Sequence, residues 1–385
     1  MSNVPKLRFK EFSGEWEEKK LKNFALIYDG THQTPKYMEA GIPFVSVENI
    51  NAIENTEKYI SKEDFDKYKI KPKKNDILMT RITAGIIGAT AVVKNDEPLA
   101  YYVSLALIRL KENQTINITF LSLYINSIYF KKELHKRIIH TAFPKKINLG
   151  DIGECHTFLP SKQEQEKIAS FLTSVDTKIE QLTKKEALLT SYKKGVMQKI
   201  FNQEIRFKAD DGSEFCDWEE KKLGDLCNIT TGKLDANAMV ENGQYRFYTC
   251  AKDYFLIDNY AFDTDALLIS GNGANVGYIH HYKGKFNAYQ RTYVLDGFKD
   301  NIFFLKYVLD KYLYKRIMKE KNEGNTPYIV MGTLTNMVII IPCLEEEQTK
   351  IANFLSSIDS KIEQVQKQLN STKEFKKALL QQMFV

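Results

Sequence analysis

The sequence predicts an α+β protein with an internal twofold repeat, in which two α+β domains are separated by two long helices that pair as an antiparallel coiled coil. Two observations carry this prediction. Blocks of sequence recur in the second half of the chain, and each half ends in a long segment whose apolar residues recur at alternating steps of three and four. A length of 385 residues with 43% hydrophobic residues suits more than one globular domain.

The repeat is visible at both ends of each half. The segment Trp-Glu-Glu-Lys-Lys-Leu at 16–21 recurs at 218–223, and residues 167–181 match residues 350–364 at an offset of 183. A gapless match of this length is not chance, and repeats should be identified before motifs. Between the matched blocks the halves diverge, so the scaffold is shared while the surface differs.

The repeat divides the chain into four segments. They are a first variable domain, a first shared helix, a second variable domain and a second shared helix, at residues 1–159, 160–203, 204–341 and 342–385.

The shared segments after Pro160 and Pro342 are expected to be helices with an apolar seam. Two near-identical seams in one chain predict that the helices pack on each other, most simply antiparallel. Only positions 186 and 193 interrupt the first series. The alternative is that the helices serve only to dimerise the protein. The seam residues predicted to pair are Ile168, Leu172, Val175, Ile179 and Leu182 in the first helix, and Ile351, Leu355, Ile358, Ile362 and Val365 in the second.

Each variable domain combines short β-rich runs with one helical stretch near its end, which predicts the α+β class. The expected helices cover 120–139 and 302–319. The expected strands cover 77–80, 89–93 and 103–110 in the first domain, and 245–250, 266–270, 278–282 and 291–295 in the second.

Composition excludes several classes of protein. The net charge of +6 permits a polyanionic partner without requiring one. The start of the sequence has no apolar run of signal-peptide length, and no segment approaches the roughly 20 apolar residues of a membrane span, so we expect a cytoplasmic protein. The five cysteines are scattered, which predicts reduced thiols rather than disulfides or a zinc site. Phosphate-loop, dinucleotide-binding, adenine-methylation, zinc-protease and serine-hydrolase motifs are all absent, which favours a binding protein over an enzyme.

Polar and glycine-rich loops are the candidate binding sites. Arg and Lys pair with guanine acceptors, Asn and Gln make two-pronged contacts to adenine, and hydroxyl groups fix register on phosphates. Each loop could equally be an ordinary turn, Arg81 a structural ion pair, and Tyr101 and Tyr289 core residues. His280 and His281 have no third ligand nearby, which favours a strand surface over a metal site. The candidate DNA-binding residues are Thr31, Gln33, Thr34, Lys36, Arg81, Thr83, Lys145 and Lys146 in the first domain, and Lys233, Asp235, Asn272, Asn275, Tyr289, Gln290, Arg291 and Asn325 in the second.

Over nearly its full length the chain resembles the specificity subunits of type I restriction–modification systems. The resemblance is carried by the Glu-Gln-x-Lys-Ile segments at 164–168 and 347–351 and by the Phe-Leu-x-Ser-x-Asp-x-Lys-Ile segments at 171–179 and 354–362. The loop segments at 30–37 and 268–277 also look like parts of such recognition domains.

The resemblance implies that each variable domain is a target-recognition domain reading one half of a split site in double-stranded DNA. It implies that the paired helices set the spacing and dock two methyltransferase subunits. About 33 helical residues span about 50 Å, and a rod of that length can hold two domains apart by about one DNA turn, roughly 34 Å. S-adenosylmethionine, ATP and magnesium are expected on the methyltransferase and restriction subunits, and no cofactor, metal or catalytic residue is expected in this chain. The alternative function is a helical interaction scaffold without a role on DNA, and an independent enzyme is a third class.

Overall fold

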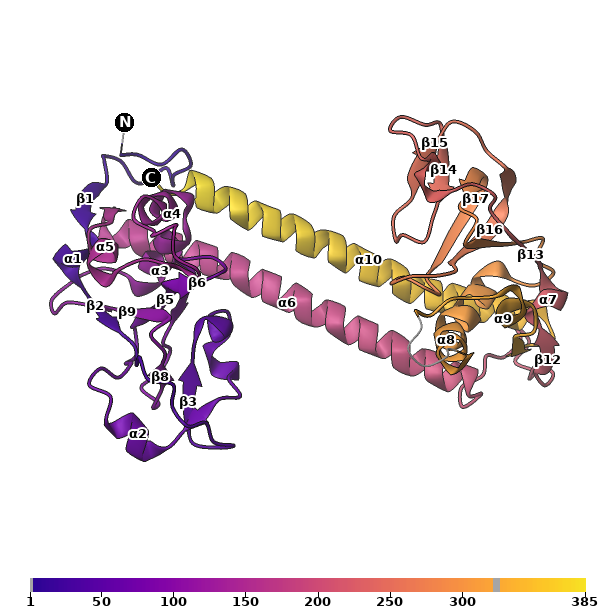
Figure 1. Cartoon of the computed structure of the whole chain (residues 1–385), viewed down its shortest axis with the longest axis horizontal. Helices are drawn as coiled ribbons and strands as arrows, with labels where there is room; N and C mark the ends of the chain where they lie inside the picture. Colours follow the sequence, from indigo (N-terminus) through magenta and orange to yellow (C-terminus); the bar gives the residue numbers. More distant parts are fainter. Residues whose placement is uncertain (1–2, 321–325) are drawn as a thin grey trace. The chain divides into compact units, whose positions relative to one another are not determined.

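The computed structural model describes residues 3–320 and 326–385 and is drawn in Figure 1. The chain forms two compact units. The first unit comprises the chain up to residue 184 together with 367–385, and the second unit comprises 185–366. Each unit therefore contains one variable domain, the beginning of one long helix and the end of the other.

The first unit is built around a four-stranded antiparallel sheet in the order β2-β9-β5-β7 and a three-stranded sheet in the order β4-β3-β8. The main sheet comprises β2 (Ala25–Asp29), β9 (Leu105–Leu110), β5 (Ile77–Thr80) and β7 (Thr90–Val92). The outer sheet comprises β4 (Tyr59–Ile60), β3 (Ile42–Val45) and β8 (Ala100–Tyr101), of which β3 and β8 are parallel. Two further pairs are β1 (Glu17–Lys20) with β11 (His156–Leu159), and β6 (Ile82–Thr83) with β10 (Lys145–Lys146).

Short helices pack on the two sheets of the first unit. They are α1 (Leu21–Phe24), α2 (Lys62–Asp66), α3 (Ile118–Asn126), α4 (Ile128–His135) and α5 (Leu149–Gly153), with 3-10 turns at Val47–Asn49 and Ile53–Asn55. Helix α2 lies on the outer sheet, where Phe65 clusters with Phe44, Ile60 and Ala100 (Figure 1). The single helix expected over 120–139 is two helices. Ser127 has extended backbone angles, and its hydroxyl accepts a hydrogen bond from the backbone N–H of Phe130, so it ends α3 and caps α4.

The second unit contains one six-stranded sheet in the order β13-β18-β16-β17-β14-β15. Its strands are β13 (Asn228–Thr231), β18 (Thr292–Asp296), β16 (Phe262–Ser270), β17 (Ile279–Ala288), β14 (Tyr245–Tyr248) and β15 (Phe255–Ile257). A separate pair joins β12 (Glu219–Lys222) to β19 (Val338–Ile341). The helices are α7 (Leu223–Leu226), α8 (Ile302–Glu320) and α9 (Met331–Thr335), with a 3-10 turn at Ala236–Ala238.

The two long helices are α6 (Lys162–Phe201) and α10 (Glu345–Gln382). In the second unit Glu186 of α6 accepts a hydrogen bond from Gln366 at 2.8 Å, and Lys193 pairs with Asp359 at 2.6 Å. As the residue number rises from 186 to 193 along α6, the number of the facing residue on α10 falls from 366 to 359, so the helices are antiparallel. These contacts also explain the two interruptions of the seam, because both polar residues have a partner on the facing helix.

Except for Leu182 and Val365, the seam residues lie in the cores of the units. Most are less than a tenth exposed, and Ile179 and Ile362 are half-buried. In the first unit they join a cluster that includes Trp16, Phe120 and Phe384, and the second unit has a matching cluster of Trp218, Phe304 and Phe201. The core packing around the long helices is therefore duplicated in the two units, as the sequence is.

One sequence expectation about the cysteines is wrong. Cys216 and Cys343 form a disulfide, with their Cα atoms 6.3 Å apart. They are 127 residues apart in the sequence, so no local spacing indicated the pairing. Cys155, Cys227 and Cys250 are free thiols.

A buried ion pair fixes the start of each long helix. In the second unit the carboxylate of Glu347 is fully buried and accepts hydrogen bonds from Arg206 Nη2 at 2.8 Å and Trp218 Nε1 at 3.2 Å. In the first unit Glu164 and Arg8 form the same pair, with Nε and Nη2 at 2.8 and 2.7 Å from the two carboxylate oxygens. A paired arginine compensates for the loss of hydration of the carboxylate.

We expect Arg206→Ala to lower the free energy of unfolding of the second unit by about 3 kcal/mol, because it leaves a buried carboxylate without its cation. Denaturant unfolding measures the loss. Lys208→Ala is the control, because its ion pair with Glu214 is 3.9 Å long and exposed, and such pairs contribute about 0–1 kcal/mol. Equal losses from both substitutions would contradict the assignment.

Candidate nucleic-acid interface

In the first unit the loop after β2 crosses the end of β8 at very close range. A Cβ atom on Gly30 would lie 2.5 Å from the backbone of Tyr102, so only glycine fits there. The next residue, Thr31, forms a bridge to Tyr102. Beyond this crossing the chain turns outward, and the candidates Gln33, Thr34 and Lys36 are exposed while Thr31 is half-buried.

A second group of candidates in the first unit comes together through a strand pair. Lys145 lies opposite Thr83, and Lys146 lies opposite Ile82, where β10 pairs with β6. Both lysines are exposed. The hydroxyl of Thr83 accepts a hydrogen bond from the backbone N–H of Gly85 at 2.9 Å and so shapes the following turn. Lys145 points to the same face as Thr83 and Lys146 to the opposite face, and each exposed ammonium group can contact a phosphate oxygen.

Arg81 is one of the candidate DNA-binding residues, but its side chain points inward. It is 8% exposed, and its guanidinium forms an ion pair with Asp29 at 2.9 Å. It also donates to the backbone carbonyls of Val103 and Ile147. The position follows directly on a fully buried strand, β5, so its side chain turns into the sheet edge. The structure thus agrees with the alternative interpretation of Arg81 as a structural ion pair.

Tyr101 is likewise a core residue. It is buried, and its hydroxyl donates to the backbone carbonyl of Asp29 at 2.8 Å. Burial raises the pKa of Tyr101 well above its usual range. The phenol therefore stays protonated and serves as a hydrogen-bond donor that holds the start of the loop.

The second unit places its candidates at the corresponding positions. Gly232 again crosses a strand end so closely that a Cβ would meet the carbonyl oxygen of Ala288, and Leu234 bridges to Tyr289. The backbone N–H of Gln290 donates to the carbonyl of Leu234 at 2.9 Å. Tyr289 is half-buried, and the exposed candidates around this crossing are Lys233, Asp235, Gln290 and Arg291.

The turn after β16 holds two more candidates. Asn272 forms a bridge to Tyr328, and the side-chain amide of Asn275 donates to the carbonyl of Cys250 at 3.0 Å. One of the two side-chain N–H groups of Asn275 is thus occupied by a bond to the backbone of Cys250. Gly273, between them, has a φ of +78°, which favours glycine. The candidate Asn325 lies outside the described residues.

Two further polar residues at these positions, His32 and Tyr328, are not among the candidates that the sequence indicated. His32 has a side chain that is 71% exposed, and its ring nitrogen lies 2.8 Å from Asp29. Tyr328 is exposed beside Asn272. Tyr328 directly follows the Thr-Pro pair at 326–327, as the candidate Lys145 follows the Phe-Pro pair at 143–144. The internal repeat could therefore have identified Tyr328 as a candidate.

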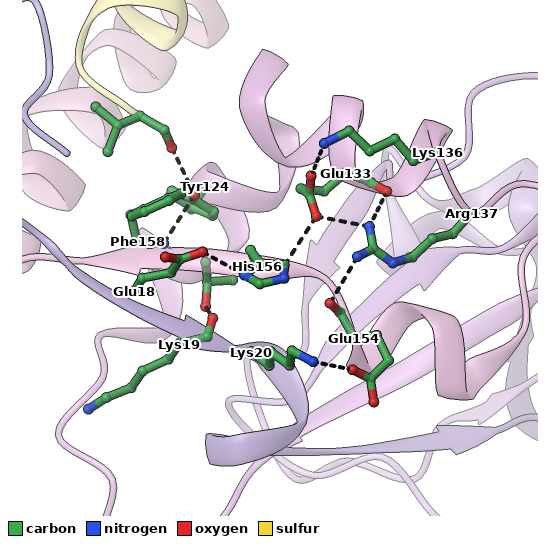
Figure 2. A network of polar contacts seen from close by, with 12 residues as sticks. Glu18, Lys19, Lys20, Tyr124, Glu133, Lys136, Arg137, Glu154, His156 and Phe158 are labelled. Carbon is green, nitrogen blue, oxygen red and sulfur yellow. Dashed lines mark hydrogen bonds and ion pairs between the residues drawn. The ribbon is translucent and has the colours of Figure 1, made fainter. Parts of the chain in front are cut away.

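A separate polar network in the first unit ties α4 to the β1–β11 pair (Figure 2). His156 lies 2.6 Å from a carboxylate oxygen of Glu18, and Glu133 pairs with Arg137 at 2.9 Å. Hydrogen bonds from Lys20 and Lys22 lower the pKa of Glu154 to about 2. The network borders a pocket of about 740 Å³. Each of these carboxylates has a cationic or imidazole partner, so the arrangement stabilises the position of α4.

No metal site emerges from the part of the chain that the structure describes: it contains no group of three or more His, Cys, Asp or Glu side chains placed to hold an ion. His280 lies 3.0 Å from the carbonyl of Ala251, and His281 lies 2.8 Å from Asp265. Among residues 3–320 and 326–385, no helix has the length and apolar character needed to cross a membrane.

Comparison with known proteins identifies the family. Residues 13–190 and 216–373 each match the type I restriction modification DNA specificity domain. The two matches cover most of both repeats, and the chain belongs to this family.

Individual relatives agree with this assignment. The chain is 40% identical over 169 residues to the type I restriction enzyme EcoDI specificity subunit of Escherichia coli, a match that covers 43% of this chain and 37% of that subunit. It is 26% identical over 409 residues to the putative type I restriction enzyme MjaX specificity subunit of Methanocaldococcus jannaschii, covering 98% and 95%. The chain thus spans well under half of the EcoDI subunit but nearly all of the MjaX subunit.

Solved structures share the fold. The type I restriction–modification S subunit from M. genitalium superposes with a TM-score of 0.68 at 18% identity, covering 99% of both chains. A chain from a structure of complex assembly in a type I restriction–modification system gives a TM-score of 0.54 at 16% identity, covering 95% of this chain and 96% of that one.

We expect the double substitution Lys145→Ala, Lys146→Ala to weaken binding equally on every DNA sequence and to reduce the slope of log affinity against log salt by about two, because each lysine would neutralise one phosphate. Fluorescence anisotropy over a range of salt concentrations measures the slope. Lys19→Ala, on β1, is the control. A loss confined to one DNA sequence would instead indicate base contacts.

Proposed function

We propose that this chain recognises DNA without catalysing a reaction, as the specificity subunit of a type I restriction–modification complex. Each variable domain reads one half of a bipartite target. The observation that carries the proposal is the duplicated loop crossing: at Gly30 and Gly232 the same tight backbone contact directs a different set of polar side chains outward. A shared scaffold with different exposed side chains suits two different half-sites.

The remaining parts of the proposal concern the partners. The paired helices set the spacing between the two half-sites and dock two methyltransferase subunits, and restriction subunits join that complex. S-adenosylmethionine, ATP and magnesium bind those partners in the cytoplasm, and this chain binds none of them.

Two exposed aromatic residues support docking on the helices. Tyr192 on α6 and Phe375 on α10 occupy equivalent positions of the repeat and are 54% and 52% exposed. The seven positions before each of them, 185–191 and 368–374, are all different between the copies. Folding does not require an exposed aromatic side chain, so its retention in both copies favours contact with the same partner twice.

We expect the intact chain to bind two copies of its methyltransferase subunit, and Tyr192→Ala or Phe375→Ala each to weaken binding of one copy by about tenfold or more, as loss of an aromatic anchor does. Native mass spectrometry counts the copies. Leu188→Ala is the matched control, since Leu188 is 61% exposed on the same helix but its repeat counterpart is Ser371. If a variant carrying both Tyr192→Ala and Phe375→Ala still bound two methyltransferase subunits with unchanged affinity, these residues would not be the docking contacts.

The modular reading of DNA is tested by exchanging residues 15–159 for the corresponding domain of another specificity subunit. We expect one half of the methylated motif to change and the other half to stay the same, as read by methylome sequencing of cells carrying the complete operon. A change in both halves, or in neither, would contradict the proposal. Absence of salt-sensitive DNA binding by the assembled complex would favour the alternative of a helical scaffold.

A further inference from the structure

The guanidinium of Arg81 joins every segment of the first unit that carries candidate DNA contacts. Its Nη2 lies 2.9 and 3.1 Å from the two carboxylate oxygens of Asp29, at the start of the loop that holds Thr31 to Lys36. Its Nη1 donates to the carbonyl of Ile147 at 3.2 Å, directly after the lysine pair of β10. Its Nε donates to the carbonyl of Val103 at 3.0 Å.

Asp29 extends this arrangement into the loop itself. One carboxylate oxygen accepts the backbone N–H of Gly30 at 3.0 Å, and the other lies 2.8 Å from the ring nitrogen of His32. A buried guanidinium with three separate acceptors has little freedom to move, and its hydrogen bonds are charge-assisted. The loop and the β6–β10 pair are therefore held relative to each other by one ion pair.

The second unit has the same backbone arrangement without this ion pair. The N–H of Arg81 donates to the carbonyl of Ser104, and its carbonyl accepts from Ile147. Gly271 makes the corresponding bonds, donating to Arg291 and accepting from Ile329. A Cβ on this glycine would lie 2.3 Å from the carbonyl oxygen of Arg291, so no side chain fits there.

Another residue takes over the role of Arg81 in the second unit. The hydroxyl of Tyr293, on β18, donates to the carbonyl of Ile329 at 2.8 Å and is buried. Ile329 corresponds to Ile147, whose carbonyl Arg81 holds in the first unit. The same main-chain carbonyl is thus fixed by a charged side chain in one unit and by a neutral hydroxyl in the other.

We propose that Arg81 with Asp29 in the first unit, and Tyr293 in the second, are positioning residues that set the fidelity of their own half-site without touching DNA. Base discrimination depends on hydrogen-bond geometry at the groove edge, so a loop that is free to shift accepts wrong bases more readily. The inference rests on the proposed function, because it assigns a role within DNA recognition.

The test uses the full chain in its complex with the methyltransferase subunits, with Asp29→Asn and Tyr293→Phe as reciprocal variants. Asp29→Asn keeps the shape of the side chain and removes its charge. We expect it to reduce discrimination against single-base changes by about tenfold in the half-site assigned to the first unit, because the loop loses the charge-assisted hydrogen bonds that hold it. Tyr293→Phe is expected to relax only the other half-site. Methylation rates on duplexes with single changes in either half provide the measurement.

Asp76→Asn is the matched control for a purely structural effect. Asp76 pairs with Arg109 at 2.6 Å in the same sheet, and Arg109 also donates to the carbonyl of Lys71, outside the candidate loops. We expect this variant to lower the unfolding temperature while half-site discrimination stays unchanged. Arg81→Lys keeps a positive charge but cannot reach all three acceptors, and we expect it to relax the first half-site as Asp29→Asn does.

The outcomes separate the two proposals. If exchange of residues 15–159 does not alter one half of the motif, the proposed function fails. If that exchange succeeds but Asp29→Asn and Arg81→Lys retain full discrimination, only the positioning role is overturned. Equal relaxation of both half-sites, or the same effect from Asp76→Asn, overturns it as well, because the effect would then come from general loss of stability.

Discussion

The need to bury the apolar seams of two long helices is the constraint on which the rest of this chain depends. A helix of this length with one apolar stripe is not stable by itself in water, and most helical stability in proteins comes from packing of that stripe. Here the end of each long helix enters the core of a variable domain. Phe201 and Phe384 pack against Trp218 and Trp16, so neither unit has a complete core without both helices.

The repeated polar residues at the helix starts have a structural explanation. The side-chain oxygen of Gln165 accepts the backbone N–H of Asn117 at 2.9 Å, and its amide donates to the carbonyl of Pro160. Gln348 makes the corresponding bonds to Asn301 and to the carbonyl of Pro342. Each glutamine satisfies buried backbone groups that would otherwise lack partners, at the junction where a variable domain meets its helix. This explains why the Glu-Gln pair stays constant while the domains around it diverge.

The sequence predicted the repeated, periodic features well, because a seam or a gapless repeat is a local pattern. The long helices, their antiparallel pairing and the main-sheet strands such as β5 at 77–80 follow from such patterns. Contacts between distant segments were not predictable. The inward orientation of Arg81 depends on Asp29 and Ile147, which are 52 and 66 residues away, and the disulfide joins cysteines 127 residues apart. Short strands such as β1 and β10 carry almost no periodicity and are defined only by their pairing partners.

The two units also differ in how their outer strands are attached. In the second unit β17 is a single strand of ten residues that pairs with β16 along most of its length and with β14 near its end. In the first unit the corresponding stretch is divided into β7 and β8, and the segment between them contains Pro98, which has no N–H to donate to a ladder. An unbroken ladder transmits a displacement of the outer strands straight into the central sheet. The interrupted one leaves a connecting segment that can take up the displacement, so we expect the outer sheet of the first domain to move more independently of its main sheet.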